Sequence, residues 1–110
     1  MTEKPLVSVI MPAFQAEKYI KQAIESVWTQ DVQLELIVID DCSSDNTRGV
    51  LEPYMKRTDF HYIRNKDNIG AAASRNKGID AANGDFIAYL DSDDWWETGK
   101  PVSYTHLRAH

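Results

Sequence analysis

The segment FIAYLDSDDWW, residues 86–96, changes from apolar to acidic within a few positions. Its first five residues form a short apolar and aromatic run of the kind that is typical of a buried strand. Asp91, Asp93 and Asp94 follow directly. Carboxylates this close together repel, because each charge disfavours the ionised form of its neighbours. The segment therefore predicts a strand that ends where a positive group belongs.

The rest of the chain repeats this strand pattern and alternates it with helical patterns. An apolar stripe at i, i+3, i+4, i+7 and i+8 predicts a helix over 20–28. Ser43, Ser44 and Asp45 supply N-cap chemistry for a second helix. Asn83-Gly84 closes a third helix, with glycine where a C-cap requires positive φ. The expected strands are 6–11, stopped by Pro12, then 34–39, 60–63 and 86–90, and the third helix is expected over 70–82.

This alternation predicts an α/β fold. Strands that alternate with helices, at connection lengths that suit right-handed crossovers, form a parallel sheet. If the first strand is central and the fourth lies on its other side, the strand order is 3-2-1-4. We therefore expect a Rossmann-like sheet with helices on both faces.

Composition narrows the class of protein further. The chain has 110 residues and a net charge of -5, which suits one small domain and argues against a nucleic-acid-binding surface. No apolar run reaches the roughly 20 residues that span a bilayer, and the N-terminus lacks a signal-peptide pattern. Cys42 is the one cysteine, so a disulfide framework is excluded. These features predict a cytoplasmic protein in a reducing compartment.

The last ten residues, PVSYTHLRAH at 101–110, show neither a helical stripe nor strand alternation. They are compatible with a flexible tail, an edge element or foreign sequence from cloning or assembly. Since the series of strands and helices stops where another helix is due, we expect residues 1–100 to be the first part of a truncated domain. His106 and His110 are assigned no role.

Polar or unusual residues follow three of the four expected strands. They are Pro12-Ala13-Phe14, Asp40-Asp41 and the acidic run at 91–94. Ligands of open parallel sheets bind outside the carboxyl ends of the strands, where the strand order reverses. With the order 3-2-1-4, all three ends converge on one crevice, which is the predicted site.

The acidic run has two interpretations. In an extended segment, Asp91 and Asp93 point to one side and can hold Mg²⁺ or Mn²⁺ together with substrate phosphates. A divalent cation would also allow an acidic site to accept a diphosphate. The alternative is a solvated turn before a helix N-terminus, where aspartate is favoured. A D-x-D pair alone does not decide between them.

Other candidates also have a structural alternative. Asp40 and Asp41 are either turn residues or acceptors for a base N–H or ribose hydroxyls. Phe14 is either a core residue or a flat surface on which a base stacks. Arg75 is either a solvated helix residue or a contact to a base or phosphate. Since no glycine-rich phosphate loop is present, the phosphates would be handled by metal.

Four ordered segments resemble the N-terminal half of a family 2 glycosyltransferase of the GT-A fold. They are VSVIMPAF (7–14), IVIDDCSSDNT (37–47), NIGAAASRNKGI (68–79) and GDFIAYLDSDDWW (84–96). The resemblance implies transfer of a sugar from a nucleotide-diphosphate donor, above all a UDP-sugar, with Mg²⁺ or Mn²⁺. The acceptor, a glycan, a lipid or another molecule, is not specified. Such an enzyme is cytoplasmic or peripheral at the inner face of the membrane.

The resemblance also implies roles for individual residues. Pro12 and Phe14 match residues that line the nucleobase pocket, and Asp41 matches the aspartate that binds the base. Arg75 lies in the A-R-N-x-G segment that helps to shape the donor site. Asp91 matches the first carboxylate of the DXD motif, near ribose and metal, and Asp93 the one that binds metal most directly. Trp95 and Trp96 would help to wall the site.

Two departures from the family pattern are visible. Gln15 stands where asparagine is common, and Cys42 stands where the family often has glycine. If the position of Cys42 requires positive φ, the cysteine is strained by about 1 kcal/mol. The catalytic base of the family lies in the C-terminal half, so this chain is expected to carry the donor and metal site and to be inactive alone.

Three other classes of protein share part of this pattern. A phosphatase of the haloacid dehalogenase type also uses D-x-D, but after its first strand. A receiver-type signalling domain needs an acidic pair after the first strand, where this chain has Pro12-Ala13-Phe14. A non-catalytic nucleotide-binding fragment is the third alternative. Hydrolysis of a phosphate ester, labelling by acetyl phosphate, and nucleotide binding without transfer would distinguish them.

Overall fold

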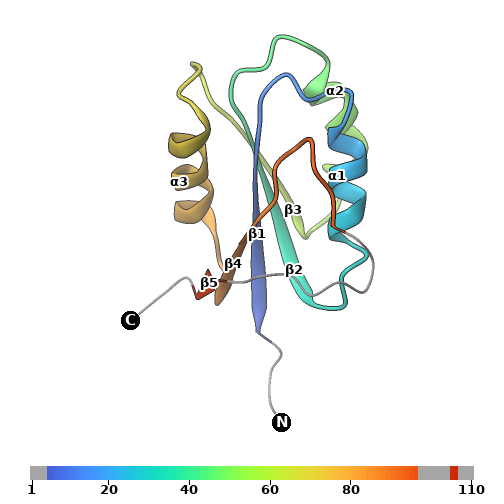
Figure 1. The fold of residues 1–110 in the computed structure, drawn as a ribbon, viewed down its shortest axis with the longest axis vertical. Helices are drawn as coiled ribbons and strands as arrows, with labels where there is room; N and C mark the ends of the chain where they lie inside the picture. The colour runs from blue at the N-terminus through green and yellow to red at the C-terminus, as the bar shows by residue number, and fades with distance from the viewer. Residues whose placement is uncertain (1–4, 97–104, 107–110) are drawn as a thin grey trace.

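The computed structural model describes residues 5–96 and the backbone of residues 105–106, which form one mixed sheet flanked by helices (Figure 1). The strand order is β3-β2-β1-β4-β5, in which the first four strands are parallel and β5 is antiparallel to β4. The α/β class and the 3-2-1-4 order expected from the sequence are confirmed. The elements are β1 (Leu6–Ala13), α1 (Ile20–Val27), β2 (Gln33–Asp40), α2 (Thr47–Leu51), a 3₁₀ turn (Glu52–Tyr54), β3 (Phe60–Arg64), α3 (Ala71–Ala81), β4 (Phe86–Tyr89) and β5 (Thr105–His106).

The sheet is covered on both faces, by α1 and α2 on one side and α3 on the other (Figure 1). Successive side chains of a strand point to opposite faces, so each central strand contributes to two cores. The larger core lies under α1 and includes Val9, Met11 and Leu36 from the sheet. The smaller core lies under α3 and contains Ile10, Ile37, Ile39, Ala82 and Ile87.

The predicted end of the first strand is wrong, because β1 continues through Pro12 to Ala13. Pro12 lies opposite Ile39 of β2, while the pairing of β1 with β4 ends at Ile10. The backbone N–H and carbonyl of Ile10 point towards β4, since the carbonyl accepts from the N–H of Leu90. Residues two apart in a strand present these groups to the same side, so the nitrogen of Pro12 also points towards β4. Because the pairing with β4 has already ended, no hydrogen bond between strands requires an N–H at Pro12.

Gly84 was expected to have positive φ, and that prediction is also wrong. Gly70, at the N-cap of α3, is the glycine with positive φ in the described part of the chain. Gly84 instead packs closely on β1, where its N–H donates to Ser8 Oγ at 2.8 Å. A Cβ at this position would lie 2.5 Å from Ser8 Oγ and 2.7 Å from the carbonyl oxygen of Leu6.

We expect Gly84→Ala to lower the free energy of unfolding by about 1–3 kcal/mol, because the added methyl group meets backbone atoms that cannot move aside cheaply. Urea denaturation measures the change. Ala72→Ser, at an exposed position of α3, is the control and should shift stability by less than about 0.5 kcal/mol. Equal effects in the two variants would contradict the close-packing explanation.

Candidate functional site

A small hollow lies at the carboxyl ends of β1 and β2, next to the start of α3. Its volume is about 70 Å³. The residues that line it are Pro12, Ala13, Phe14, Asp41, Ala71 and Ser74. Three of the sequence-predicted nucleotide-binding residues, Pro12, Phe14 and Asp41, are thus brought together around one space, at the edge of the sheet where the sequence placed the site.

Two sharp turns shape this hollow. The strands β1 and β2 remain joined just beyond their ends, where the N–H of Asp41 donates to the carbonyl of Ala13 at 2.8 Å. The chain then turns at Gln15, with φ 52, and at Cys42, with φ 61. Both are non-glycine residues in the left-handed region, so the strain of about 1 kcal/mol expected at Cys42 applies.

The carboxylate of Asp41 is buried and is held by three hydrogen bonds. Oδ1 accepts from Asn65 Nδ2 at 2.9 Å and from the N–H of Ile69 at 2.8 Å. Oδ2 accepts from the N–H of Gly70 at 2.9 Å. Burial alone would raise the pKa of Asp41, but these donors and the charge of Lys77 outweigh burial and lower the pKa below its usual value. The group is therefore an ionised acceptor that also fixes the start of α3.

Asp40, the neighbour of Asp41, belongs to the opposite face of the sheet. Its carboxylate accepts from Tyr62 Oη at 2.6 Å and from Arg64 Nη1 at 3.1 Å. It also accepts from the N–H of Ser43 at 2.9 Å. Asp40 is thus a buried structural anchor under the loop that follows β2, and only Asp41 faces the hollow.

The exposed residues around the hollow are aromatic and basic. Phe14 is 53% exposed although it is large and apolar, so one wall of the hollow offers an open ring face. Arg75 is exposed on α3 and is not among the residues that line the hollow. Lys77, one turn from Ser74, is the α3 cation whose charge acts on Asp41.

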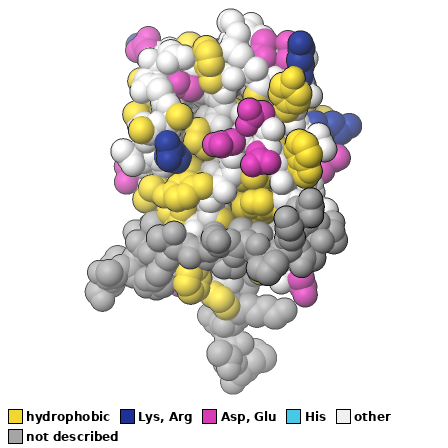
Figure 2. Space-filling model, viewed as in Figure 1, with side chains coloured by type: hydrophobic (Ala, Val, Ile, Leu, Met, Phe, Trp, Pro, Cys, Tyr) yellow, Lys and Arg dark blue, Asp and Glu magenta, His cyan; other side chains and the backbone are white. Residues whose placement is uncertain are grey.

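The acidic run after β4 forms a turn, which is the conformation of the second of its two interpretations, and it is not extended. The N–H of Asp94 donates to the carbonyl of Asp91 at 3.0 Å. Asp91 and Asp93 are both exposed, and neither lines the hollow. Acidic side chains gather on the face that Figure 2 shows, with hydrophobic side chains on both sides of them.

Within residues 5–96, no three His, Cys, Asp or Glu side chains are placed to hold a metal ion together. Magnesium is often bound by one or two carboxylates and completed by substrate phosphates and water. The donor set of Asp91 and Asp93, two exposed hard oxygen ligands, therefore fits a metal that enters with a diphosphate.

The two tryptophans behave differently from each other. Trp95 is 50% exposed. Trp96 packs against the core under α1, and its backbone N–H donates to Ser26 Oγ at 3.0 Å. Trp96 thus contacts α1, and neither tryptophan is among the residues that line the hollow.

Sequence reasoning missed two buried polar residues beside Asp41. Asn65 Nδ2 bridges Asp41 Oδ1 and Ser74 Oγ, which it reaches at 3.0 Å. Asn65 comes directly after β3, so the rule that polar residues at strand ends mark the site would have found it. Ser74 had a weaker signal: it lies on one stripe with Gly78 and Ala82, whose small side chains let α3 approach the sheet.

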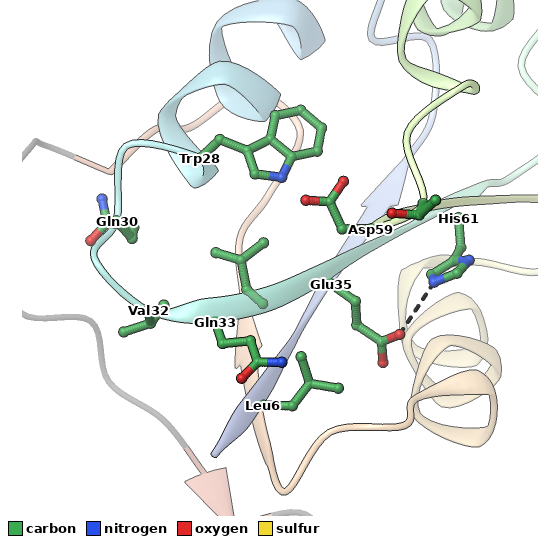
Figure 3. A pocket seen from close by; sticks show the side chains of 10 residues that line it. Leu6, Trp28, Gln30, Val32, Gln33, Glu35, Asp59 and His61 are labelled. Atoms are coloured by element: carbon green, nitrogen blue, oxygen red, sulfur yellow. Dashed lines mark ion pairs between the residues drawn. The ribbon is translucent and has the colours of Figure 1, made fainter. Parts of the chain in front are cut away.

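A second, larger hollow of about 480 Å³ lies at the opposite edge of the sheet (Figure 3). Its carboxylates already have partners: Glu35 Oε1 lies 3.2 Å from His61 Nε2, and Asp59 Oδ1 lies 2.8 Å from Arg57 Nε. It is formed by the amino ends of β2 and β3, where parallel sheets do not usually bind ligands. We therefore place the candidate site at the carboxyl edge.

The described residues form a Rossmann-like α/β domain with a hollow at the carboxyl ends of its strands, and comparison with known proteins gives the family. The sequence pattern of glycosyl transferase family 2 matches residues 8–101. The chain therefore belongs to glycosyl transferase family 2. This membership favours the glycosyltransferase interpretation over the phosphatase and receiver alternatives.

Individual relatives agree with this assignment. The chain is 47% identical over 97 residues to the UDP-Glc:alpha-D-GlcNAc-diphosphoundecaprenol beta-1,3-glucosyltransferase WfgD of Escherichia coli, covering 86% of this chain and 38% of that protein. The crystal structure of Staphylococcus aureus TarS 1-349 in complex with UDP matches with a TM-score of 0.74 and 34% identity, over 81% of this chain and 28% of that one. The chain thus spans less than two fifths of the length of these relatives.

A more distant structure shows the same fold. The mannosyltransferase PcManGT of Pyrobaculum calidifontis, in complex with GDP-Man and Mn²⁺, matches with a TM-score of 0.78 at 24% identity, over 86% of this chain and 29% of that one. The fold of the described residues is therefore that of the GT-A glycosyltransferases. None of the helices in the described residues is both long enough and apolar enough to cross a membrane.

Proposed function

We propose that this chain supplies the donor-binding part of an enzyme that transfers a sugar from a nucleotide-diphosphate sugar, with UDP as the nucleotide. The observation that carries the proposal is the hollow between Phe14 and Asp41, at the carboxyl ends of β1 and β2 of a family 2 chain. It combines an open aromatic ring with a buried, ionised acceptor. That pair can hold a flat base that presents an N–H group.

We infer a role for each residue from its position around the hollow. The ring of Phe14 stacks on the base, and Pro12 forms the floor beside it. Asp41 Oδ2 accepts one hydrogen bond within the described residues, from Gly70, so it can also accept the N–H of a base. Arg75 is exposed one residue beyond Ser74 and is proposed to contact the donor from the rim.

Asp91 and Asp93 are proposed to hold Mg²⁺ or Mn²⁺, with Asp91 also near the ribose. When bound, such a cation neutralises the diphosphate and stabilises it as the leaving group. The protein contributes two exposed carboxylates on a turn at the end of β4, close to the switch in strand order between β1 and β4.

The relatives support this choice of donor and suggest an acceptor. TarS was crystallised with UDP and also with UDP-GlcNAc, and the WfgD name specifies UDP-Glc and a lipid-linked sugar. We propose a UDP-sugar donor here, and a glycan or lipid-linked acceptor at the cytoplasmic face of the membrane. The base that deprotonates the acceptor is expected in the later part of the longer protein, so this chain alone should bind the donor without turnover.

The test is a calorimetric titration of UDP into the chain, with and without Mn²⁺. We expect Mn²⁺ to strengthen UDP binding about tenfold or more, and Asp93→Ala to remove that gain, because the metal bridges carboxylate and diphosphate. Asp31→Ala removes an exposed acid before β2 and is the matched control, which should bind as the wild type does. A folded wild-type chain that does not bind UDP when Mn²⁺ is present would contradict the proposed function.

A further inference from the structure

The loops that follow β1 and β2 are tied to each other by side-chain hydrogen bonds, a set that we call the loop brace. Its members come from residues 15–17 on one side and 43–47 on the other. The hydrogen bonds run from Gln15 N to Ser43 Oγ, from Gln15 Nε2 to Ser44 Oγ, from Ser44 N and Asp45 N to Gln15 Oε1, from Ala16 N to Thr47 Oγ1, and from Glu17 N to Asp45 Oδ2. No strand pairing joins these two segments.

Gln15 takes part in four of these bonds through its backbone and its side chain. Its N–H donates to Ser43 Oγ at 2.9 Å. Its carbonyl oxygen Oε1 accepts from the N–H of Ser44 at 2.6 Å and from that of Asp45 at 3.3 Å. The side-chain amide of Gln15 thus accepts hydrogen bonds from the backbone of the other loop, as a backbone carbonyl would. This pairing holds Gln15 at φ 52, which is unfavourable for a residue with a Cβ.

The brace is adjacent in the sequence to Phe14 and Asp41, two residues that line the hollow. Gln15 follows Phe14 in the chain, and Ser43 is separated from Asp41 only by Cys42, which is itself at φ 61. Any movement of one loop relative to the other would therefore change the gap between the ring of Phe14 and the carboxylate of Asp41. The remaining bonds, from Ala16 and Glu17, lie farther along the chain and join the approaches to α1 and α2.

We propose that Gln15 is a positioning residue for the nucleobase: its side chain fixes the separation of Phe14 and Asp41 without touching the ligand. The proposal rests on the proposed function, since it assumes that the hollow binds the base. Gln15 is exposed and lies outside both cores, so its side chain should influence affinity far more than overall stability.

The test compares Gln15→Met and Gln15→Glu with the wild type. Methionine keeps the length of the side chain but removes all its hydrogen bonds, whereas glutamate keeps an oxygen that accepts from Ser44 and Asp45. We expect Gln15→Met to bind UDP about tenfold more weakly, which corresponds to loss of one or two hydrogen bonds. Gln15→Glu should stay within about threefold of the wild type. Gln22→Met, at an exposed position of α1, is the matched control and should bind normally.

Two further readouts separate positioning from general loosening. In Gln15→Met, the amide hydrogens of Ser44 and Asp45 should exchange faster, while the urea midpoint and the affinity for Mn²⁺ alone should remain those of the wild type. If the wild type binds UDP and Gln15→Met binds it equally well, the positioning role is overturned. If the wild type does not bind UDP, the proposed function fails and the positioning role fails with it.

Discussion

Replacing Glu35 with alanine is expected to lower the free energy of unfolding by about 3 kcal/mol, because it leaves the buried hydroxyl of Ser8 and the partly buried N–H of Asn83 without an acceptor. Glu35 is 5% exposed and lies between Leu34 and Leu36 in β2. Its Oε2 accepts from Ser8 Oγ at 2.6 Å and from the N–H of Asn83 at 2.7 Å. Its Oε1 accepts from Asn83 Nδ2 at 3.2 Å. One carboxylate thus joins β1, β2 and the connection between α3 and β4.

Urea denaturation at neutral pH measures this loss, and Glu35→Gln is the matched variant. Glutamine keeps the size of the side chain and one acceptor oxygen, so it should be destabilised less than alanine. Glu25→Ala, at an exposed position of α1, should have little effect. If Glu35→Ala lowered the free energy of unfolding by less than about 1 kcal/mol, as an ordinary surface substitution does, the anchoring role would be contradicted.

The same group predicts an acid dependence. Burial works to raise the pKa of Glu35, but the hydrogen bonds from Ser8 and Asn83 and the nearby His61 outweigh it and lower the pKa below its ordinary value of 4.5. A carboxylate with a lowered pKa contributes stability above its unfolded pKa and loses it as the pH falls through the folded pKa. Stability should therefore fall below pH 4.5, and less steeply in Glu35→Gln than in the wild type.

The fold was predictable because local patterns and the global arrangement agree. The stripe of Ile20, Ala23, Ile24 and Val27 is fully buried, as its helical spacing predicts. The two errors in the predicted fold concern residues whose conformation depends on contacts with distant segments of the chain. Pro12 continues β1 because pairing on that side has already ended, and Gly84 is required by its contact with Ser8 and Leu6. In both cases the deciding contact is with a segment far away in the sequence.

The candidate site was predictable to the level of strand ends and no further. The rule that ligands meet the carboxyl edge of a parallel sheet brought Phe14 and Asp41 together correctly. It could not show that Asp41 is held by Asn65, Ile69 and Gly70, because that contact depends on how the loop before α3 folds back. Glu35 was missed for the same reason: its partners come from three separate segments.

The two edges of the sheet use their acids differently, which is why one edge is the better candidate site. At the amino edge, Glu35 and Asp59 are matched by His61 and Arg57, so the charges are compensated within the chain. At the carboxyl edge, Asp40 is paired with Arg64, but Asp91 and Asp93 are exposed, and no ion pair involves them in the part of the chain that the structure describes. Exposed carboxylates without an ion-pair partner are available to a divalent cation, as the proposed function requires.

Asp41→Asn is expected to weaken UDP binding at least about thirtyfold and to lower the free energy of unfolding by about 2 kcal/mol. Asparagine has the same shape, but in either orientation its NH₂ group faces the N–H of Gly70 or the two donors from Asn65 and Ile69, and the donors on that side lose their acceptor. In the proposed function, it also removes the negatively charged acceptor for the N–H of the base. Calorimetry with UDP and urea denaturation measure the two effects separately.

Asp80→Asn, on the exposed side of α3, makes the same change of charge and should leave both quantities as in the wild type. The pKa of Asp41 is lowered from 3.8, because the N–H of Ile69 and its other donors outweigh burial, so its carboxylate should remain an acceptor throughout pH 5 to 8. UDP affinity should therefore show no dependence on Asp41 ionisation over that range. If Asp41→Asn lost stability but bound UDP as tightly as the wild type, Asp41 would be only the anchor of α3, and the base would have to be held elsewhere.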